Sequence, residues 1–570
     1  MNLEEFRTHG KYMIDYICDY TEYVGHYRVV PSPEVNPGFL RPLLPTEAPK
    51  EPESFVKILK DFNEKVFPGV VHWTHPRFHA YFPAGGAYAS ILGDMLSSTI
   101  NCIGFSWASS PACTELEIIV LDWFGKAIGL PDDFITSAKN SKGGGAFETS
   151  ASECVLVCML AARNQAIQYL KRDSPNSIHD SEFLPKLICY ASKDAHSCVE
   201  KAAKILLVKI RTLDPDENGS LRGETVRAAM EEDIAKGLFP FLVTATLGTT
   251  GSASFDNLEE IGPVCKLQPC TWLHVDAAYA GSGFILPELK YLLKGVEYID
   301  SFNTNPNKWL LTNFDCSCLW VRCKHKLTSA FVIDPVYLQH ANSDEAIDYR
   351  HWGIPLSRRF RSLKLWFVLR NYGLSGLQNY MRNHIKLAKY FESLVRNNSR
   401  FEVVNDVRLG LVCFRLRGPD SENVKLLTNI NASGELFMVP SIIKGKYSIR
   451  FCVVAEHATQ DDMDTAWKII QKYSQQVSPR PRLTRQKSSR LSFTRSVSKE
   501  MYQRSKSKSN LLDGATPILV VDSDEDEEGN NNTDDILDAL TSVSVYDDDV
   551  FTKENEEEKR MPPQSPPNYL

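Results

Sequence analysis

The sequence predicts an α/β fold with a largely parallel central sheet, a smaller C-terminal α+β domain and a disordered tail. From about residue 85 to 310, short strand-like runs alternate with longer helical segments, as in a parallel sheet covered by helices. Residues 381–475 mix strand and helix patterns in a shorter stretch. Residues 476–570 are rich in charge and poor in aromatics, and such a composition cannot bury enough apolar surface to fold.

The N-terminal segment, residues 1–84, is predicted to be helical and extended. Residues 1–25 show the spacing of an amphipathic helix. The apolar positions on its predicted face are Phe6, Met13, Ile14, Ile17 and Tyr20. A proline-rich arm follows at 31–52, then a second helix at about 52–67. The aromatic run at 72–83 is typical of a core or an interface, and less often of a pocket wall.

The predicted large domain, residues 85–380, contains three clear strand-like runs at 186–191, 241–246 and 272–275. Polar residues follow each of them. Because parallel strands end at one edge of a sheet, and open α/β sheets bind ligands along that edge, we expect these polar residues to form a site. A long helix is predicted at 362–398, at the junction with the small domain.

The charge of the chain is concentrated in the tail. Residues 479–508 carry ten Lys or Arg and one acid, whereas 513–560 carry seventeen acids and three bases. The rest is close to neutral, so no basic excess indicates nucleic-acid binding. Two interpretations of the tail stay open. It is either a solvated appendage or a regulatory segment that binds partners, with Ser488 and Ser498 in sequences typical of basic-directed kinase sites.

The sequence also indicates a compartment. No apolar run reaches the roughly 18 residues of a membrane span, and the acidic, polar start of the chain is unlike a secretory signal. The fourteen cysteines are scattered, without a Cys-x-x-Cys pair. We therefore expect reduced thiols in a cytoplasmic protein, without a metal site or a membrane partner.

Lys308 and Asp276 indicate the chemistry. Asp276 closes a predicted buried strand, and Lys308 follows 32 positions later, before a tryptophan. A lysine amine can form a Schiff base with the aldehyde of pyridoxal phosphate, while a carboxylate keeps the ring nitrogen protonated. Taken singly, such a lysine is more often a surface residue lying over an aromatic ring, and such an aspartate more often a cap or turn residue.

Two further segments support this interpretation. Three glycines at 143–145 precede Ser150-Ala-Ser-Glu153, a capping box that predicts a helix start at Ser150. Either Ser150 only caps this helix, or the amides of Ala151 and Ser152 also bind an anion such as a phosphate. His196 follows another strand and is either a hydrogen-bonded structural residue or a group that stacks on a flat ring. Thr249 and Thr250 follow a third strand.

These segments resemble the group II pyridoxal-phosphate-dependent amino acid decarboxylases, a family that includes aromatic-L-amino-acid, histidine and tyrosine decarboxylases. The resemblance covers roughly residues 1–475. It rests on the following motifs: Gly143-Gly-Gly145, Ser150-Ala-Ser-Glu153, Asp194-Ala-His-Ser197, Ala245-Thr-Leu-Gly-Thr-Thr250, His274-Val-Asp-Ala-Ala-Tyr-Ala-Gly281, Asn305-Pro-Asn-Lys-Trp309, Cys102-Ile-Gly-Phe-Ser-Trp-Ala108, Ser110-Pro-Ala-Cys-Thr-Glu-Leu116 and His351-Trp-Gly-Ile-Pro-Leu-Ser-Arg-Arg-Phe360.

The resemblance implies the fold type I of pyridoxal-phosphate-dependent transferases, the aspartate-aminotransferase-like fold. It also implies a homodimer with active sites at the subunit interface, in which the N-terminal segment embraces the partner. Lys308 would carry the cofactor as a Schiff base, with Asp276 at the ring nitrogen, His196 stacked on one face of the ring and Ala278 on the other. The phosphate would be bound by Ala151, Ser152 and Asn305, with Thr250 nearby.

The same resemblance implies where the substrate binds. Trp73, Phe82 and Pro83 would line the pocket, together with Ile103 and Phe105 of the neighbouring subunit. Tyr337, on a mobile loop, would return a proton to Cα. Relatives that form aldehydes instead of amines carry another residue in place of the histidine or the loop tyrosine. Because His196 and Tyr337 are both present, plain decarboxylation to an amine is favoured.

Ser357 guides the choice of substrate. Broad aromatic-amino-acid decarboxylases have glycine there, whereas tyrosine and histidine decarboxylases resemble this chain in having serine. A hydroxyl can hydrogen-bond a polar ring substituent, for about 1 kcal/mol net. Ala84-Gly85, Gly353 and Asn307 are most similar to invertebrate tyrosine decarboxylases. We therefore predict that tyrosine is converted to tyramine, with histidine and DOPA or 5-hydroxytryptophan as alternative substrates.

Glu148 and Thr149 depart from the Gln-Gly that is usual before the phosphate-binding turn. Threonine would be strained there if the backbone needed a positive φ. A carboxylate would repel a phosphate unless it points away. A catalytically impaired paralogue that acts as a scaffold for partners is therefore a second interpretation.

Overall fold

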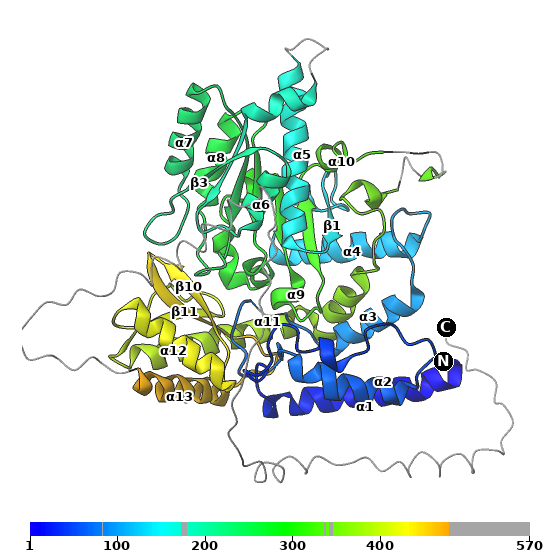
Figure 1. The fold of residues 1–570 in the computed structure, drawn as a ribbon. Helices are drawn as coiled ribbons and strands as arrows, with labels where there is room; N and C mark the ends of the chain where they lie inside the picture. The colour runs from blue at the N-terminus through cyan, green and yellow to red at the C-terminus, as the bar shows by residue number, and fades with distance from the viewer. Residues whose placement is uncertain are drawn as a thin grey trace, which may run out of the picture. The chain divides into compact units, whose positions relative to one another are not determined.

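A seven-stranded sheet organises the larger part of this computed structural model, which describes residues 1–82, 84–172, 179–333, 335, 338–340, 342 and 346–477 (Figure 1). Its strands are β1 (Gly144–Glu148), β2 (Leu187–Ser192), β3 (Lys209–Leu213), β4 (Phe239–Thr246), β5 (Trp272–Asp276), β6 (Ser301–Thr304) and β7 (Ser317–Val321). Their order is β1-β7-β6-β5-β4-β2-β3. Neighbours from β3 to β6 run parallel, while β7 is antiparallel to both β6 and β1. The predicted largely parallel sheet is confirmed.

Helices cover both faces of this sheet. One face carries α5 (Ala151–Lys171), α6 (Cys198–Ile205) and α10 (Lys324–Thr328). The other carries α4 (Pro111–Ile128), α7 (Gly223–Ala235) and α8 (Leu258–Leu267). Successive residues of a strand point to opposite faces, so Ala146 joins the first of these cores and Phe147 the second. Burial on both faces explains why β4 and β5 are nearly continuous apolar runs.

A second sheet is antiparallel. It consists of β8 (Phe401–Val403), β9 (Leu411–Leu416), β10 (Val439–Ile443) and β11 (Lys446–Cys452), in the order β10-β11-β9-β8. Figure 1 shows it in yellow, beside α12 (Asp420–Ser433) and α13 (Gln460–Gln476). Together with the second half of α11 (Ser362–Arg396) these elements enclose a separate core. The predicted domain boundary at 380/381 falls inside α11, and the domain limits remain a prediction.

The N-terminal region contains α1 (Leu3–Tyr23), α2 (Phe55–Asp61) and α3 (Tyr88–Ile100). The predicted first helix is confirmed, and Asn2 begins it with a capping box that includes Glu5. None of the residues of α1 is buried, and Phe6 on its predicted apolar face is 61% exposed. In this single chain Tyr20 packs against the rings of Tyr27, Phe67 and His72. Phe6 and Ile14 on the same predicted face stay exposed.

Several predictions concern residues outside the described part of the chain. These are Pro83, Tyr337 and all but the first two residues of the predicted tail. Among the described residues, no helix has both the length and the apolar character that crossing a bilayer requires. All fourteen cysteines lie within the described residues and are free thiols, ten of them buried.

Candidate active site

Lys308 lies in α9 (Pro306–Trp309), a single turn that directly follows β6. Its backbone N–H donates to the Asn305 carbonyl at 2.9 Å, which fixes the turn. The neighbouring Trp309 is fully buried and stacks at 5.0 Å on Tyr279. The backbone that carries Lys308 is therefore firmly anchored. Burial lowers the pKa of its amine, while the Asp276 carboxylate opposes that shift.

Asp276 is the last residue of β5, and its side chain is 4% exposed. Its Oδ1 accepts hydrogen bonds from the backbone N–H of Ala278 at 3.0 Å and from the Asn303 amide at 3.3 Å. Asn303 is its register partner on the parallel strand β6. Among the described residues no donor bonds Oδ2, so one carboxylate oxygen is held in place and the other is available to a ligand.

His196 follows β2, on the same edge of the sheet. Its Nδ1 accepts a hydrogen bond from the Cys198 N–H at 3.2 Å, so the neutral ring carries its proton on Nε2. Burial lowers the pKa of His196, the charge of Asp276 raises it and that of Lys308 lowers it. These electrostatic interactions show that His196, Asp276 and Lys308, which are far apart in the sequence, meet in one site.

The N-terminus of α5 provides an anion site on this edge. Ser150 caps the helix, as predicted, and its hydroxyl accepts from the Glu153 N–H at 3.3 Å. In the part of the chain that is described, the N–H groups of Ala151 and Ser152 have no acceptor. The Asn305 side-chain oxygen accepts a hydrogen bond from the Ser317 hydroxyl at 2.8 Å. Its amide nitrogen has no acceptor among the described residues. Such free donors at a helix N-terminus suit a phosphate.

These groups together fit pyridoxal phosphate. The free N–H groups and Asn305 would hold its phosphate, Asp276 its ring nitrogen, His196 its ring face and Lys308 its aldehyde. Cys198, which sequence analysis missed, links two parts of the site. Burial raises the pKa of its thiol to about 12, so Cys198 stays protonated. The Asp276 charge also raises the pKa of this thiol, while the Ser152 hydroxyl and the Lys308 charge lower it.

Phe82 forms a wall beside Lys308. Its ring stacks on Tyr279 with centroids 3.8 Å apart, and the Lys308 Nζ lies 5.8 Å from its centroid. The preceding residue, Tyr81, stacks on Trp73 at 5.1 Å, so two predicted pocket residues lie on adjoining stacks. Thr250 and His196 line one cavity of about 1200 Å³, whose lining does not include Lys308, Asp276 or Phe82.

Arg450 is a second residue that sequence analysis missed. Its guanidinium lies 4.9 Å from the Phe82 centroid and its charge lowers the pKa of Lys308. Arg450 is 3% exposed, donates to the Tyr81 carbonyl at 3.2 Å and leaves its Nε without a partner in the described structure. The signal for it was a lone charge between apolar residues of a strand, which usually points to a partner or a ligand.

Glu148 and Thr149 are accommodated. Thr149 is not among the residues with positive φ, so the condition for backbone strain is not met. Its N–H and hydroxyl both bond the Glu153 carboxylate, at 2.8 and 2.5 Å. The Glu148 side chain is directed toward Gly353, and burial raises its pKa to about 8. At neutral pH it is therefore mostly uncharged and repels a phosphate little.

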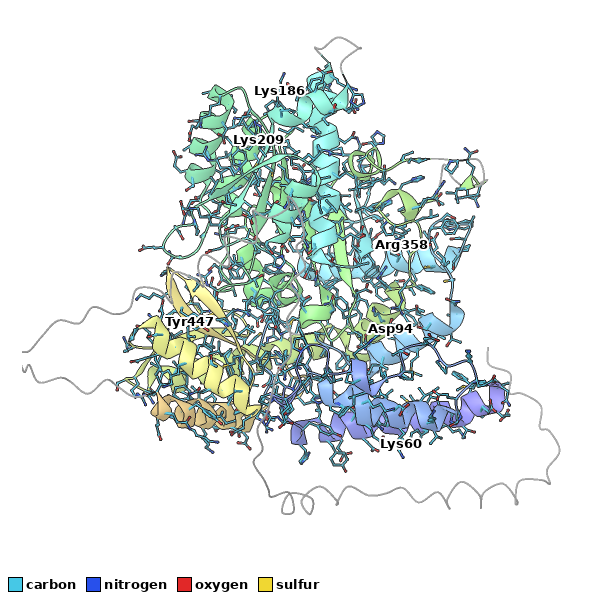
Figure 2. The ribbon with its side chains drawn as sticks, in the orientation of Figure 1. Lys60, Asp94, Lys186, Lys209, Arg358 and Tyr447 are labelled. Carbon is cyan, nitrogen blue, oxygen red and sulfur yellow. The ribbon has the colours of Figure 1, made fainter. Side chains whose placement is uncertain are left out.

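Three predicted substrate residues lie in another place. Ile103, Phe105 and Ser357 belong to two loops that are joined by backbone hydrogen bonds from Gly104 to Arg358 at 3.2 Å and from Arg350 to Phe105 at 2.8 Å. Ile103 is 48% exposed and Ser357 is also exposed. Arg358, labelled in Figure 2, anchors this pair of loops through Glu117 of α4.

Comparisons with known proteins agree with this geometry. The pyridoxal-dependent decarboxylase conserved domain matches residues 37–417. The chain is 50% identical to aromatic-L-amino-acid decarboxylase of Mus musculus over 479 residues, 84% of this chain and 99% of that protein. It is 51% identical to histidine decarboxylase of Drosophila melanogaster over 477 residues, 84% of this chain and 56% of that protein.

A solved structure shows the same fold. The crystal structure of Oryza sativa TDC with PLP and tryptamine aligns with a TM-score of 0.80 and 35% identity, over 84% of this chain and 99% of that one. The predicted fold type I is thereby confirmed. A family match of this extent establishes membership, so the chain belongs to the group II pyridoxal-dependent decarboxylases, amino acid lyases whose cofactor is pyridoxal phosphate.

Proposed function

We propose that this decarboxylase converts an aromatic L-amino acid to its amine, with tyrosine as the substrate and tyramine as the product, in active sites that two copies of the chain share. The convergence of Lys308, Asp276 and His196 beside the free N–H groups of α5 carries the proposal of catalysis. The exposed hydroxyl of Ser357 supports the choice of tyrosine, because it can hydrogen-bond a phenol.

The residues of the chain divide the work of the reaction. Bound pyridoxal phosphate supplies an electron sink for the electrons of the broken bond. The lowered pKa of Lys308 increases the fraction of neutral, nucleophilic amine. The Asp276 carboxylate stabilises positive charge at the ring nitrogen, and the flat side chain of His196 holds the ring in place. Phe82 excludes water from the reacting atoms.

We assign binding of the substrate α-carboxylate to Arg450. It is a buried cation with an unpartnered Nε, close to both Lys308 and Phe82. A substrate carboxylate would supply the missing acceptor and offset the desolvation of the guanidinium. After carbon dioxide leaves, the Tyr337 hydroxyl would donate the proton to Cα, as the family resemblance implies. Tyr337 lies outside the described residues.

The assembly we propose is a homodimer. α1 exposes its apolar side chains, and the joined loops expose Ile103 together with Ile354 and Leu356, 58% and 46% exposed. Burying these groups against a second copy would remove apolar surface from water. Ile103 and Phe105 would then enter the partner's pocket. Because the loop of Ser357 is hydrogen-bonded to theirs, Ser357 would enter the same pocket.

Product analysis by mass spectrometry tests the substrate. Purified protein supplied separately with tyrosine, DOPA, 5-hydroxytryptophan and histidine should form tyramine with the highest kcat/KM. Absence of tyramine would overturn the choice of tyrosine. Histidine is the second candidate, because one of the relatives, at 51% identity, is a histidine decarboxylase. The Ser357 hydroxyl can also hydrogen-bond a ring nitrogen. Hydrogen peroxide release during turnover would instead indicate aldehyde formation.

A further inference from the structure

Glu148 is a buried acid that neither the family pattern nor the proposed mechanism explains. It is the last residue of β1 and lies three positions before Ala151, where α5 begins. Its side chain is 4% exposed, and within the described ranges no group hydrogen-bonds its carboxyl oxygens. Burial of this kind favours the uncharged form of a carboxyl group.

The position of the carboxyl group is set by Gly353. A Cβ atom at Gly353 would lie 3.0 Å from Oε1 and 3.1 Å from Oε2 of Glu148. These contacts are tighter than most Cβ contacts, so a side chain at position 353 would require the carboxyl group to shift by a few tenths of an ångström. The acid at 148 and the glycine at 353 thus fit one another in the structure.

Charged neighbours do not neutralise Glu148. On the loop before α11, Arg358 forms two bonds with Glu117 of α4, at 2.6 and 3.0 Å, and Arg361 forms two with Asp315, at 3.1 and 3.2 Å. On α5, the neighbouring groups are the Glu153 carboxylate and the thiols of Cys154 and Cys158. Burial foremost, then Glu153, raises the pKa of Glu148 to about 8, against the opposing charge of Arg358.

We propose that Glu148 is a proton-dependent positioning residue for the cofactor, which permits tight binding of the phosphate while it is uncharged and weakens that binding when it ionises. This proposal rests on the proposed placement of the phosphate at Ala151 and Ser152. Three positions separate Glu148 from Ala151, which limits the distance between their Cα atoms to about 11 Å. In a poorly solvated region a negative charge at such a range would repel the phosphate. Cofactor affinity should therefore fall as the pH rises through about 8.

The test is equilibrium binding of pyridoxal phosphate to the apoprotein, followed by tryptophan fluorescence from pH 6.5 to 9.5. We compare wild type, Glu148→Gln and the exposed-acid control Glu200→Gln. Titration of groups other than Glu148 changes the dissociation constants of all three proteins alike. The ratio of the wild-type to the Glu148→Gln dissociation constant therefore reports only the effect of the Glu148 charge. We expect this ratio to rise about tenfold across that range, which corresponds to about one pKa unit of coupling. A constant ratio overturns the proposal.

Pyridoxal, which lacks the phosphate, distinguishes a failure of this proposal from a failure of the phosphate placement. With pyridoxal the ratio should stay constant, and a rise would mean that Glu148 acts on another group. Ala151→Pro removes one N–H at a helix position that tolerates proline. If it weakens binding of pyridoxal phosphate but not of pyridoxal, the placement holds. If it weakens neither, the placement is wrong and the proposal fails with it.

A second set of variants covers the case in which Glu148→Gln does not fold. Gly353→Ala forces the carboxyl group to move, so it should weaken binding of pyridoxal phosphate several-fold at pH 7. In the Glu148→Ala background the same change has space available and should have no effect. Equal effects of Gly353→Ala in both backgrounds would contradict the coupling of the two residues.

Discussion

Two groups of predicted site residues behave differently in this structure. Lys308, Asp276 and His196 come from three separate segments and converge at one edge of the large sheet. Ile103, Phe105 and Ser357 come from two segments and also gather, but on exposed loops. The first group is complete within one chain. The second would be completed only in the homodimer that we propose.

The difference follows from what each group must do. Ionisable groups that perform chemistry need a preorganised environment with few water molecules, which the carboxyl ends of buried strands supply. Asp276 obtains it from Ala278 and Asn303. Residues that recognise a side chain need only shape and one polar contact, which loops can supply across an interface. We therefore expect catalysis and recognition to be separable by mutation.

The largest expected effect is that of Lys308→Ala. Without the amine, the covalent link to the cofactor is lost, and kcat/KM should fall on the order of 10⁴-fold or more. The yellow colour of the cofactor-bound protein should disappear as well. Lys326→Ala, an exposed lysine of α10, serves as the control. If the Lys308 variant stayed active and coloured, the assignment of the whole site would be wrong.

Complementation tests whether the two groups belong to different chains. Ile103→Arg places a long cation in the proposed partner pocket, and because Ile103 is exposed it should not disturb folding of the chain. Alone, this variant and Lys308→Ala should each be nearly inactive. Mixed by co-expression, they should regain about a quarter of wild-type activity, because half of the dimers are mixed and each mixed dimer has one intact site. No recovery would place both groups in one chain's site.

Arg450→Met should lower kcat/KM, because the substrate carboxylate would lose its buried cation. The expected loss of transition-state stabilisation is about 2–4 kcal/mol. Its control is Arg415→Met, in the same antiparallel sheet, where the arginine is already paired with Asp420 at 2.8 Å. That variant should reduce the melting temperature while kcat/KM stays near the wild-type value. Equal kinetic losses in the two variants would contradict the assignment of Arg450.

The smallest effect is expected for Ser357→Gly, which removes one hydrogen bond worth about 1 kcal/mol. The ratio of kcat/KM for tyrosine to that for phenylalanine, which has no hydroxyl, should fall about fivefold. Ser357→Thr keeps a hydroxyl and should retain the wild-type ratio. If both variants kept that ratio, Ser357 would have no part in recognising the phenol.

Much of the fold follows from local patterns. The strands that end at Thr246 and Asp276, the helix capped by Ser150 and the long helix from Ser362 were predictable, because periodicity and capping are properties of neighbouring residues. Lys308 and Asp276 were found because an acid that ends a strand and a lysine 32 positions later suit one cofactor. Arg450 was missed because its segment has no recognised motif, and Cys198 was missed because a lone cysteine after a motif indicates no role. Tyr337, Pro83 and most of the tail lie outside the described residues, and their predicted roles stay predictions.

By itself, the sequence determined the parallel sheet, the polar edge at the ends of its strands and the type of chemistry. Each of these depends on the identity and spacing of residues along one segment. Only the tertiary structure decided that Thr149 is unstrained, that Glu148 fits the space beside Gly353, and that Arg450 lies close to Lys308. These outcomes depend on burial and on distances between remote segments, which no local pattern contains.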